Sequence, residues 1–342
     1  MHKKVSIIIP TYNRAHVITD TLKSIVEQTY DDWECIVVDD HSDDNTKEVV
    51  ESYIAKNTSF QYYKRPVDKP KGANACRNYG LKKSSTDYVI FLDSEDFLSK
   101  DCLKDRMEAV ENYPEKDGVI FTMERFPARE NQSNIINKDP KVTADTEIYL
   151  KMFLAHQLPW AITCPIWKKD ALLAIGGFDE SLQRLQDVDL AIRLLLNNIQ
   201  LERIHKTDCF YKIDESGDAK YKDIKFIKKA VKSFIPFMET TLQNIENRSD
   251  TSELKTYVKS SAYIFFKNYI FPFNSELTKE KQELYNVLKK HNVCSKKDVR
   301  YLWILQLIIT FKLQTIKGVG IHKFLSNIKK RFLKSYELIQ ES

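Results

Sequence analysis

The chain has 342 residues, enough for one large α/β domain and a smaller second one. Its content of 42% hydrophobic and 30% charged residues excludes extensive disorder. The net charge of +5 is unevenly spread, since residues 1–220 carry 30 basic and 37 acidic side chains, a net of −7, and the rest carries 23 and 11, a net of +12. A basic tail of this kind suits a polyanion or an anionic membrane surface.

The first part of the chain alternates short apolar runs with amphipathic segments. The runs, which we predict to be buried strands, are residues 5–9, 33–38, 60–63 and 88–92. The predicted helices, where apolar residues recur every three or four positions, are residues 17–28, 46–56, 73–83 and 103–112. This βαβαβαβα order predicts an α/β fold with a Rossmann-like, mostly parallel sheet covered by helices on both faces.

Less regular patterns follow in the second part of the chain. They predict a polar surface loop near an acceptor site at residues 127–141, an apolar stretch at 162–167, a helix at 187–197 and a strand at 201–205. After residue 218 the pattern becomes helical and rich in lysine. We therefore expect two domains, an α/β domain at residues 1–218 and a basic, mainly helical region at residues 219–342.

The cysteines and the N-terminal residues indicate the cellular compartment in which the protein works. None of the six cysteines lies in a C-x-x-C pair, which favours reduced thiols over a disulfide framework or a structural zinc site. The first apolar run, residues 5–9, is too short for a secretory signal and no small-residue cleavage site follows it. Both observations predict a cytoplasmic protein.

Three acidic clusters stand out because ligands of doubly wound sheets bind beyond the carboxyl ends of the strands. In the first cluster, Asp39 and Asp40 come directly after the second predicted strand. Two carboxylates at this place suit hydrogen bonds to a base or a ribose. Alternatively, the cluster is only the capped start of the next helix, with Asp44 or Asn45 as the N-cap.

The second cluster, Asp93-Ser94-Glu95-Asp96, follows the fourth predicted strand. If the extended geometry persists for two residues, Asp93 and Glu95 point the same way and Asp96 flanks them. Mg²⁺ and Mn²⁺ prefer carboxylates together with substrate phosphates, so this cluster predicts a metal site. The alternative is an acidic turn, in which closely packed like charges would repel one another.

The third cluster opens the predicted helix at residues 187–197. Asp189 and Arg193 are four residues apart and can form an ion pair on the face of that helix. Asp187 stands at the start of the helix, after a glycine-marked turn, and is better placed to project into a cleft as a general base.

Five motifs in this order resemble those of family 2 glycosyltransferases with the GT-A fold, of the type that builds bacterial cell-surface polysaccharides. They are VSIIIPTYNR at residues 5–14, VDDHSDDNT at 38–46, GANACRN at 72–78, DSED at 93–96 and GGFDE at 176–180. Gln186-Asp187 then falls where that family usually has Glu-Asp. The resemblance covers roughly residues 5–195, and each motif is weak alone, whereas five in order are a specific signal.

The resemblance implies an inverting transfer of a hexose or N-acetylhexosamine from a nucleoside-diphosphate sugar, expected to be a UDP-sugar, to a hydroxyl of a polysaccharide or lipid-linked acceptor. It also implies Mg²⁺ or Mn²⁺ as cofactor, held by Asp93, Glu95 and Asp96, with Asp187 as the general base. The implied donor-binding residues are Pro10, Thr11, Tyr12, Asn13, Arg14, Asp39, Asp40, Lys71, Arg77, Asp93 and Ser94. The implied acceptor-side residues are Trp160, Gly177, Phe178, Asp179 and Gln186.

Two positions depart from the family's pattern. Glu95 stands where the family usually has Asp, which lengthens the ligand arm by one methylene and bears on the choice of metal. Gln186 replaces a Glu, which changes an acceptor contact and leaves the base candidate in place. Some relatives also carry a metal-binding His after the last predicted strand, and here His205, Asp214 or neither fills that role.

The basic tail contains one apolar core, residues 301–311, which is about half the ~20 residues that a bilayer-spanning helix needs. From Lys296 to Lys334 the only acidic residue is Asp298. One interpretation is a helix lying in the headgroup region at the inner face of the cell membrane, with Tyr301 and Trp303 at the interface. The other is a helical subdomain that packs its apolar face on the catalytic domain.

Two other functions compete with sugar transfer. A nucleotidyltransferase also uses a carboxylate-bound metal on an α/β sheet, but it needs a glycine- and lysine-rich phosphate loop where this chain has residues 10–14. A catalytically decayed relative that binds a membrane or nucleic acid is the other, although we expect no nucleic-acid partner for the chain. The donor sugar, the base, the acceptor, the linkage and the oligomeric state do not follow from the sequence.

Overall fold

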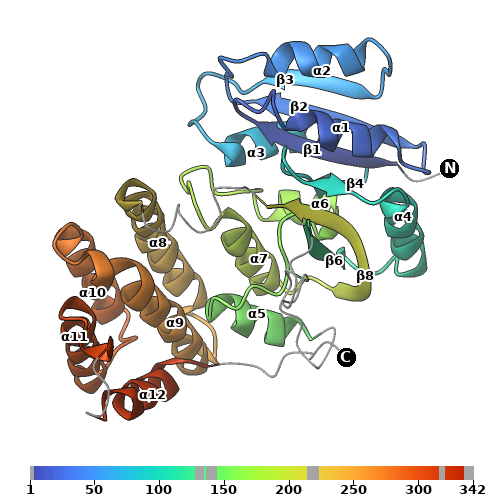
Figure 1. Cartoon of the computed structure of the whole chain (residues 1–342). Helices are drawn as coiled ribbons and strands as arrows, with labels where there is room; N and C mark the ends of the chain where they lie inside the picture. Colours follow the sequence, from blue (N-terminus) through green and yellow to red (C-terminus); the bar gives the residue numbers. More distant parts are fainter. Residues whose placement is uncertain (1–3, 128–134, 136–144, 214–222, 316–319, 335–342) are drawn as a thin grey trace. The chain divides into compact units, whose positions relative to one another are not determined.

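The computed structural model of the chain describes residues 4–127, 135, 145–213, 223–315 and 320–334 (Figure 1). Its backbone contacts divide the chain into two compact units. Unit 1 contains residues 1–146 and 158–215, and unit 2 contains residues 147–157 and 216–337. The predicted boundary at residue 218 lies outside the described residues, and residues 147–157, which precede it, group with unit 2.

Unit 1 is built on a mixed, mostly parallel sheet of eight strands in the order β3-β2-β1-β4-β7-β6-β8-β5. The β1–β2, β2–β3, β1–β4 and β6–β8 pairs are parallel, and the other three pairs are antiparallel. The strands are β1 Val5–Thr11, β2 Trp33–Asp39, β3 Phe60–Lys64, β4 Tyr88–Phe91, β5 Phe97–Leu98, β6 Gly118–Phe126, β7 Pro165–Lys168 and β8 Leu201–Lys212. The predicted fold class is confirmed.

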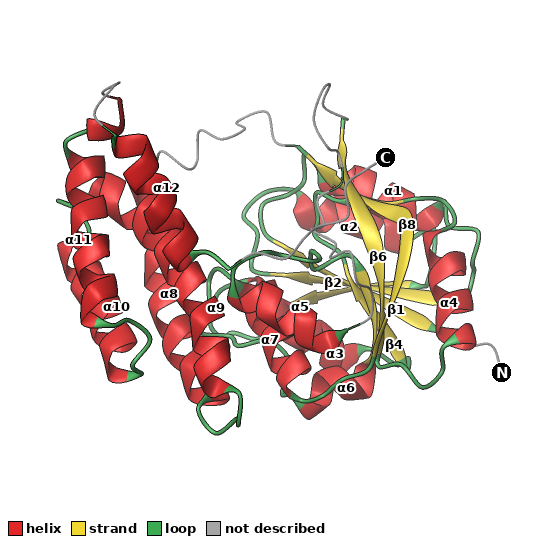
Figure 2. Cartoon of the chain, turned by 90° about the horizontal axis from the view of Figure 1, so that it is seen from below, coloured by secondary structure: helices red, strands yellow, loops and turns green. Residues whose placement is uncertain are grey.

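Helices cover both faces of this sheet, with α1 and α2 on one face and α3 and α7 on the other (Figures 1 and 2). The change of face follows from the strand order, because the chain leaves β1 toward β2 and β3 and then returns to the other side of β1 as β4. The helices of unit 1 are α1 Ile18–Val26, α2 Thr46–Ile54, α3 Ala73–Lys83, α4 Cys102–Asn112, α6 Lys169–Ala174 and α7 Gln186–Leu196.

The centre of the sheet explains the continuous apolar runs in the sequence. All seven residues of β1 are buried, because the strand has a neighbour on each side and a helix layer on each face. On α3, Gly80 lies so close to β1 that a Cβ there would be 2.5 Å from Cγ2 of Ile8. Glycine therefore allows α3, which carries the third motif, to approach the strand that carries the first.

Several elements of unit 1 were not expected from the sequence, among them the short strand β5 and the helix α6. β6 was not among the predicted strands, and β8 continues to Lys212, well beyond the predicted strand at residues 201–205. Both strands gain length by pairing with each other over Gly118–Phe126, a contact between segments far apart in the chain. Most of the predicted surface loop at residues 127–141 lies outside the described residues.

Unit 2 is a helical unit with its own aromatic core. Phe234 stacks on Phe265 with 3.4 Å between ring centroids, and Tyr263 stacks on Phe332 at 5.1 Å. None of the helices in the described part of the chain is both long enough and apolar enough to cross a membrane. The elements are α5 Thr146–Leu154, α8 Ile224–Ile245, α9 Thr251–Phe265, the π-helix Phe266–Ile270, the 3₁₀ turns Phe271–Phe273 and Leu313–Thr315, α10 Thr278–Lys290, α11 Lys296–Thr310 and α12 Ile321–Phe332.

Candidate active site

Three of the five motifs follow strands where the strand order of the sheet reverses. β1 lies between β2 and β4 and runs parallel to both. In the register, Thr11 at the end of β1 pairs with Asp39, and Ile8 pairs with Phe91 at the end of β4. The segments that follow these strand ends therefore share one edge of the sheet, the place where doubly wound folds bind ligands.

The loops after β1 and β2 are joined by hydrogen bonds. Asn13 has a φ of 53°, a left-handed conformation, and its backbone N–H donates to Oγ of Ser42 at 2.9 Å. In return, the N–H of Asp43 donates to Oδ1 of Asn13 at 2.8 Å, and the N–H of Arg14 donates to Oγ1 of Thr46 at 3.0 Å. The first two motifs thus form one supported surface.

Asp39 and Asp40 are buried within this surface and have partners in the protein. Asp39 accepts hydrogen bonds from the N–H of Ser42 and the hydroxyl of Tyr62, both at 2.7 Å. Burial and this hydrogen bond to Asp39 raise the pKa of Tyr62. Asp40 forms an ion pair with Arg65, and both side chains are buried. The structure therefore uses these two carboxylates to hold the loops in place.

Thr11, Tyr12 and Lys71 offer polar, aromatic and cationic groups to a ligand at the end of β1. Oγ1 of Thr11 is buried and has no hydrogen-bond partner among the described residues. Tyr12 is partly exposed, and Nζ of Lys71 lies 3.7 Å from the centre of its ring. A hydrogen bond with Tyr12, followed by nearby negative charges, raises the pKa of Lys71. An aromatic face next to a cation suits a base and a diphosphate.

The acidic motif after β4 forms a turn, contrary to the extended geometry on which the alignment of Asp93 with Glu95 depended. The N–H of Asp96 donates to the carbonyl of Asp93 at 3.0 Å, and the chain then enters β5. The side chain of Asp93 binds Arg77, whereas Glu95 lies 3.4 Å from Arg14. Ser94 is buried inside the turn. The turn forms because β5 pairs with the distant strand β8, which draws the chain away from β4.

Asp96 is the member of this turn whose environment fits a cation. Its side chain is buried, and its Oδ1 has no hydrogen-bond partner among the described residues. Burial, followed by the charges of Asp93 and Glu95, raises the pKa of Asp96 well above its usual value. A buried carboxylate oxygen without a partner, beside two further carboxylates, fits a divalent metal ion, which would offset the repulsion.

In the structure, the carboxylates of this turn do not converge on a common point. In the parts of the chain that the structure describes, no three His, Cys, Asp or Glu side chains form a group that could hold a metal ion. His205 therefore belongs to no such group, and Asp214 lies outside the described residues. The contact of Glu95 with Arg14 accounts for this arrangement, since it holds Glu95 to the loop after β1.

Arg77 on α3 connects the remaining motifs. Its guanidinium donates to Oδ1 of Asp93 at 2.6 Å and to Oε1 of Gln186 at 3.0 Å. It also lies over the ring of Phe178, with 5.3 Å from Cζ to the ring centre. The side chain is 4% exposed. One buried cation therefore contacts the acidic turn, the start of α7 and the glycine turn, which come from widely separated parts of the sequence.

Asp187 follows Gln186 in the first turn of α7 and lies within the electrostatic reach of Arg77 and Asp93. Removal of its carboxyl group from water raises the pKa of Asp187, and the negative charge of Asp93 raises it further. A backbone hydrogen bond and the positive charge of Arg77 lower this pKa, but the net shift is upward. A partly buried carboxylate with a raised pKa is suited to take up a proton. The base candidate therefore lies close enough to Asp93 of the acidic turn to be affected by its charge.

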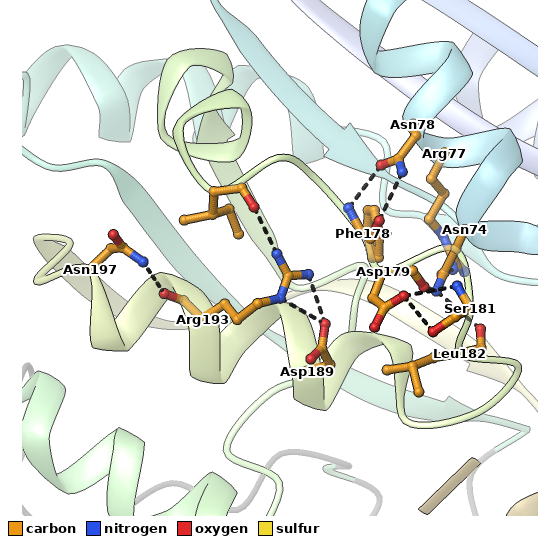
Figure 3. A network of polar contacts seen from close by, with 11 residues as sticks. Asn74, Arg77, Asn78, Phe178, Asp179, Ser181, Leu182, Asp189, Arg193 and Asn197 are labelled. Carbon is orange, nitrogen blue, oxygen red and sulfur yellow. Dashed lines mark hydrogen bonds and ion pairs between the residues drawn. The ribbon is translucent and has the colours of Figure 1, made fainter. Parts of the chain in front are cut away.

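The glycine turn is held by two asparagines of α3, as Figure 3 shows. Asn78 accepts a hydrogen bond from the N–H of Phe178 at 2.8 Å and donates to its carbonyl at 2.9 Å. Asn74 donates to the carbonyl of Asp179 at 2.6 Å. Gly177 has a φ of +71°, and a Cβ there would collide with Oδ1 of Asn78. Glycine is therefore needed both for the backbone conformation and for the close approach.

Three other residues predicted for the acceptor side or the third cluster are paired or buried within the protein. The carboxylate of Asp179 accepts hydrogen bonds from the N–H and the hydroxyl of Ser181, at 2.8 and 2.7 Å. Trp160 is buried. Asp189 pairs with Arg193 at 2.7 Å, which confirms the predicted helix-face ion pair (Figure 3).

A cavity of about 280 Å³ opens beside the glycine turn, on the side of α3 that carries Asn78. It combines the backbone of the turn with two lysines and one glutamate, of which Lys69 and Glu180 lie 3.8 Å apart. Its lining residues are Lys69, Asn78, Leu81, Lys82, Leu173, Gly176, Gly177, Phe178 and Glu180.

The sequence did not identify the supporting residues of the site. Arg65 and Tyr62 belong to β3 or follow it, and the rule that residues after parallel strands face the ligand edge could have found Arg65. Asn74 and Asn78 stand in the third motif, and their spacing of four residues puts them on one face of α3. No local pattern indicates which distant turn that face contacts.

Comparison with known proteins identifies related sequences. Residues 6–164 match the family described as glycosyl transferase family 2. A GalNAc(5)-diNAcBac-PP-undecaprenol beta-1,3-glucosyltransferase of Campylobacter jejuni is 28% identical over 292 residues, which cover 84% of this chain and 87% of that protein. An uncharacterized glycosyltransferase of Rickettsia bellii is 27% identical over 52% of this chain, and the match spans only 24% of that protein's own length.

Solved structures show the same fold. Staphylococcus aureus TarS, residues 1–349, in complex with UDP-GlcNAc superimposes with a TM-score of 0.68 at 19% sequence identity, over 99% of each chain. This likeness concerns the fold, because the identity is low. The family match, the related glycosyltransferases and the common fold lead to one conclusion: residues 6–164 belong to glycosyl transferase family 2, and unit 1 has the GT-A fold.

Proposed function

We propose that the chain is an inverting glycosyltransferase that moves a hexose or N-acetylhexosamine from a UDP-sugar to a hydroxyl of a polysaccharide or lipid-linked acceptor. The observation that carries the proposal is the cluster around Arg77, which joins Asp93 on the donor side to Gln186, the neighbour of Asp187. Family membership favours sugar transfer over nucleotidyl transfer. The UDP-GlcNAc complex of TarS supports UDP as the nucleotide.

The donor would bind along the edge where β1, β2 and β4 end. Tyr12 offers a face for the uracil ring, Lys71 a positive charge for the diphosphate, and Oγ1 of Thr11 an unused hydrogen-bonding group. Asp39 and Asp40 would act by fixing these loops through Tyr62 and Arg65. The whole of residues 10–14, together with Ser94, would form the surface that contacts the nucleotide.

The chemical step would need one base and one leaving group. The carboxylate of Asp187 takes the proton of an acceptor hydroxyl, whose oxygen forms a bond to the anomeric carbon from the face opposite the diphosphate. The bond between the anomeric carbon and the diphosphate oxygen breaks, and UDP leaves with that electron pair. Attack from the opposite face inverts the configuration. Arg77, Phe178 and Gln186 would hold Asp187 and the acceptor in register with the donor.

A divalent cation fits this scheme. Asp93, Glu95 and Asp96 would hold Mg²⁺ or Mn²⁺, once Glu95 leaves Arg14, and the buried Oδ1 of Asp96 would gain the partner that it lacks. When bound, such an ion supplies positive charge that neutralises the charge developing on the departing diphosphate.

We also propose a lipid-linked acceptor and a location at the inner face of the cell membrane. The name of the Campylobacter relative includes an undecaprenyl diphosphate, and such lipid carriers lie in membranes. A cytoplasmic chain at the inner face of the cell membrane, with the basic residues 219–342 in contact with the lipid, would reach an acceptor of this type.

The experiment that tests the proposal is a donor screen. We expect UDP and UDP-sugars, in the presence of Mn²⁺, to raise the melting temperature of the chain, because a ligand that binds only the folded state stabilises it. GDP-sugars should raise it less, and EDTA should reduce the shift. With the right UDP-sugar and an undecaprenyl-diphosphate glycan, UDP should be released only when the acceptor is present.

A matched pair of variants locates the binding site. Asp93→Asn should reduce the shift caused by UDP and Mn²⁺, because Asp93 is proposed to contact the donor and to hold the metal. Asp179→Asn should leave it unchanged, since that carboxylate is occupied by Ser181. If no nucleotide raises the melting temperature of the unmodified chain, the proposal is wrong.

A further inference from the structure

Helix α11 of unit 2 carries an apolar ridge on its exposed side. Val299, Trp303, Leu307 and Phe311 follow one another at intervals of four residues, so they line one side of the helix. Val299, Trp303 and Phe311 are 42%, 56% and 67% exposed, and Leu307 is half-buried. A soluble helix normally turns such a ridge inward, and this one needs another explanation.

The inward side of α11 is already occupied by a separate set of apolar residues. Leu302, Leu305 and Ile308 are buried in unit 2. The helix is therefore apolar on two sides, one packed within the unit and one exposed. Packing of the helical unit accounts for the first set only.

The surroundings of the ridge are positively charged. Lys296, Lys297 and Arg300 precede or flank it and are exposed, and Lys312 follows Phe311. The single acidic residue between positions 296 and 334, Asp298, is 3% exposed. No negative side chain of this segment therefore opposes an anionic partner.

Asp298 is not only buried but also neutralised inside the unit. It accepts hydrogen bonds from Ser295, and it pairs with Arg331 at 2.7 Å and with Lys259 at 3.6 Å. Arg331 belongs to α12, and it also lies over the ring of Tyr301 on α11, 5.3 Å from the ring centre. The two basic helices α11 and α12 are thus fixed to each other.

Helix α12 extends the charged surface. Tyr301 packs against Phe324 of α12, with 6.2 Å between ring centroids. Lys323, Lys329 and Lys330 of that helix are exposed. Several cations therefore stand on two helices whose mutual position is set by ring contacts and an ion pair.

We propose that the exposed side of α11, the ridge of Val299, Trp303, Leu307 and Phe311, docks in the headgroup region of an anionic lipid bilayer. The cations around the ridge meet the lipid phosphates, and Trp303 sits at the interface between headgroups and acyl chains. The helix lies in the membrane plane, since its 15 residues are too few to cross. The inference rests on the proposed function in one respect, because a lipid-linked acceptor is found at that surface.

Charge decides between a membrane and the other occupants of such a ridge. A second copy of the chain would bring the same cations against each other, which opposes pairing through this side. Nucleic acid would satisfy the cations but offers no apolar region for Val299, Leu307 and Phe311. An anionic bilayer satisfies both requirements.

Trp303 is a built-in probe for the first test. The other tryptophans, Trp33, Trp160 and Trp167, are 9%, 3% and 1% exposed, so a quencher dissolved in water reaches mainly Trp303. We expect vesicles of phosphatidylcholine with phosphatidylglycerol to protect it from iodide and to shift its emission to shorter wavelength. Pure phosphatidylcholine vesicles should have little effect, and high salt should reverse the protection.

Variants test the ridge and its charges separately by co-sedimentation with the same anionic vesicles. Trp303→Asp should lower vesicle binding by about tenfold or more, because a large apolar side chain no longer enters the interface. The double variant Lys296→Gln/Arg300→Gln should lower it several-fold and flatten its salt dependence. The control Val26→Asp, at a position that is 49% exposed on α1 of unit 1, should bind as the unmodified chain does.

Thermal shifts with UDP on the same samples separate this inference from the proposed function. Vesicle binding without a response to UDP would support the ridge and contradict the transferase proposal. Unchanged vesicle binding by both the Trp303 variant and the double variant would overturn the inference, as would equal binding to neutral vesicles. It would also be overturned if sedimentation showed a dimer of the unmodified chain that Trp303→Asp dissociates.

Discussion

Two strand ends of unit 1 carry similar acidic runs, but the carboxylates of the two runs differ in burial and in their partners. After β2, Asp39 and Asp40 are 1% and 5% exposed, and their partners are Ser42, Tyr62 and Arg65. After β4, Asp93 and Glu95 remain partly exposed, and Oδ1 of Asp96 has no partner among the described residues. The same residue type at the same place in the fold is therefore structural in one case and available to a ligand in the other.

Hydrogen-bond and ion-pair partners, more than position in the fold, therefore distinguish the two roles. A carboxylate whose acceptor sites are filled by the protein has little left to offer a substrate or a metal. One that is buried with an unfilled site carries a cost in stability that binding can remove. Variants at the two places should therefore affect different measurements, stability after β2 and activity around β4 and α7.

The largest effect is expected for Asp187→Asn. Loss of the proposed base should lower kcat by about 10²- to 10⁴-fold. The melting temperature should stay the same or rise at neutral pH. The reason is that burial raises the pKa of Asp187, so the charged form destabilises the folded state above that pKa, and the neutral amide removes this cost.

The pH profile provides the control for the base assignment. In the unmodified chain, kcat/KM should fall toward acid pH as Asp187 takes up a proton, and the fall should begin above the usual aspartate range because its pKa is raised. Asp187→Asn should lack this acid limb. Turnover equal to that of the unmodified chain would exclude Asp187 as the base.

Asp40→Asn should have the next largest effect, and on stability. The substitution leaves the buried guanidinium of Arg65 without its counter-ion, which costs about 3–5 kcal/mol in comparable buried pairs. Urea unfolding monitored by circular dichroism measures the loss. Adding Arg65→Met should restore part of it, because the unpaired charge is removed.

Asp93→Asn is the matched comparison for that stability loss. Its carboxylate also binds an arginine, but the Asp93 side chain is 39% exposed, and the buried Arg77 keeps its contacts with Gln186 and Phe178. We expect a much smaller change in the unfolding midpoint and a large loss of donor binding. Equal destabilisation by both variants would remove the distinction drawn between the two strand ends.

Gly177→Ala should have a moderate effect at the acceptor side. The new Cβ would collide with Asn78 and would force a left-handed conformation, with φ of +71°, on a residue that resists it. A loss of about 1–3 kcal/mol and a raised KM for the acceptor should follow. Gly176→Ala is the control, since its φ is +77° but nothing lies near its Cβ, so it should show the backbone cost alone.

The sequence was sufficient for the fold and for the identity of most site residues, but not for their contacts. Continuous apolar runs identify β1 and β2 because each is covered on both faces. β6 and the full length of β8 depend on their pairing with each other across the chain, which no local pattern shows. In the same way, Arg77 could be named from its motif, whereas its contact with Gln186, over a hundred residues away, could not.

The smallest effect is expected for Gln186→Glu, which tests how Arg77 divides its charge between the two sides of the site. A glutamate would compete with Asp93 for the guanidinium and would add a negative charge beside Asp187. Both changes favour the protonated form of Asp187, so the acid limb of the kcat/KM profile should move to higher pH, with little change in the rate at alkaline pH. Gln186→Met, which removes the contact without adding charge, should leave the limb close to its original position. A limb that shifts equally in both variants would mean that packing, and not charge, sets the pKa of this aspartate.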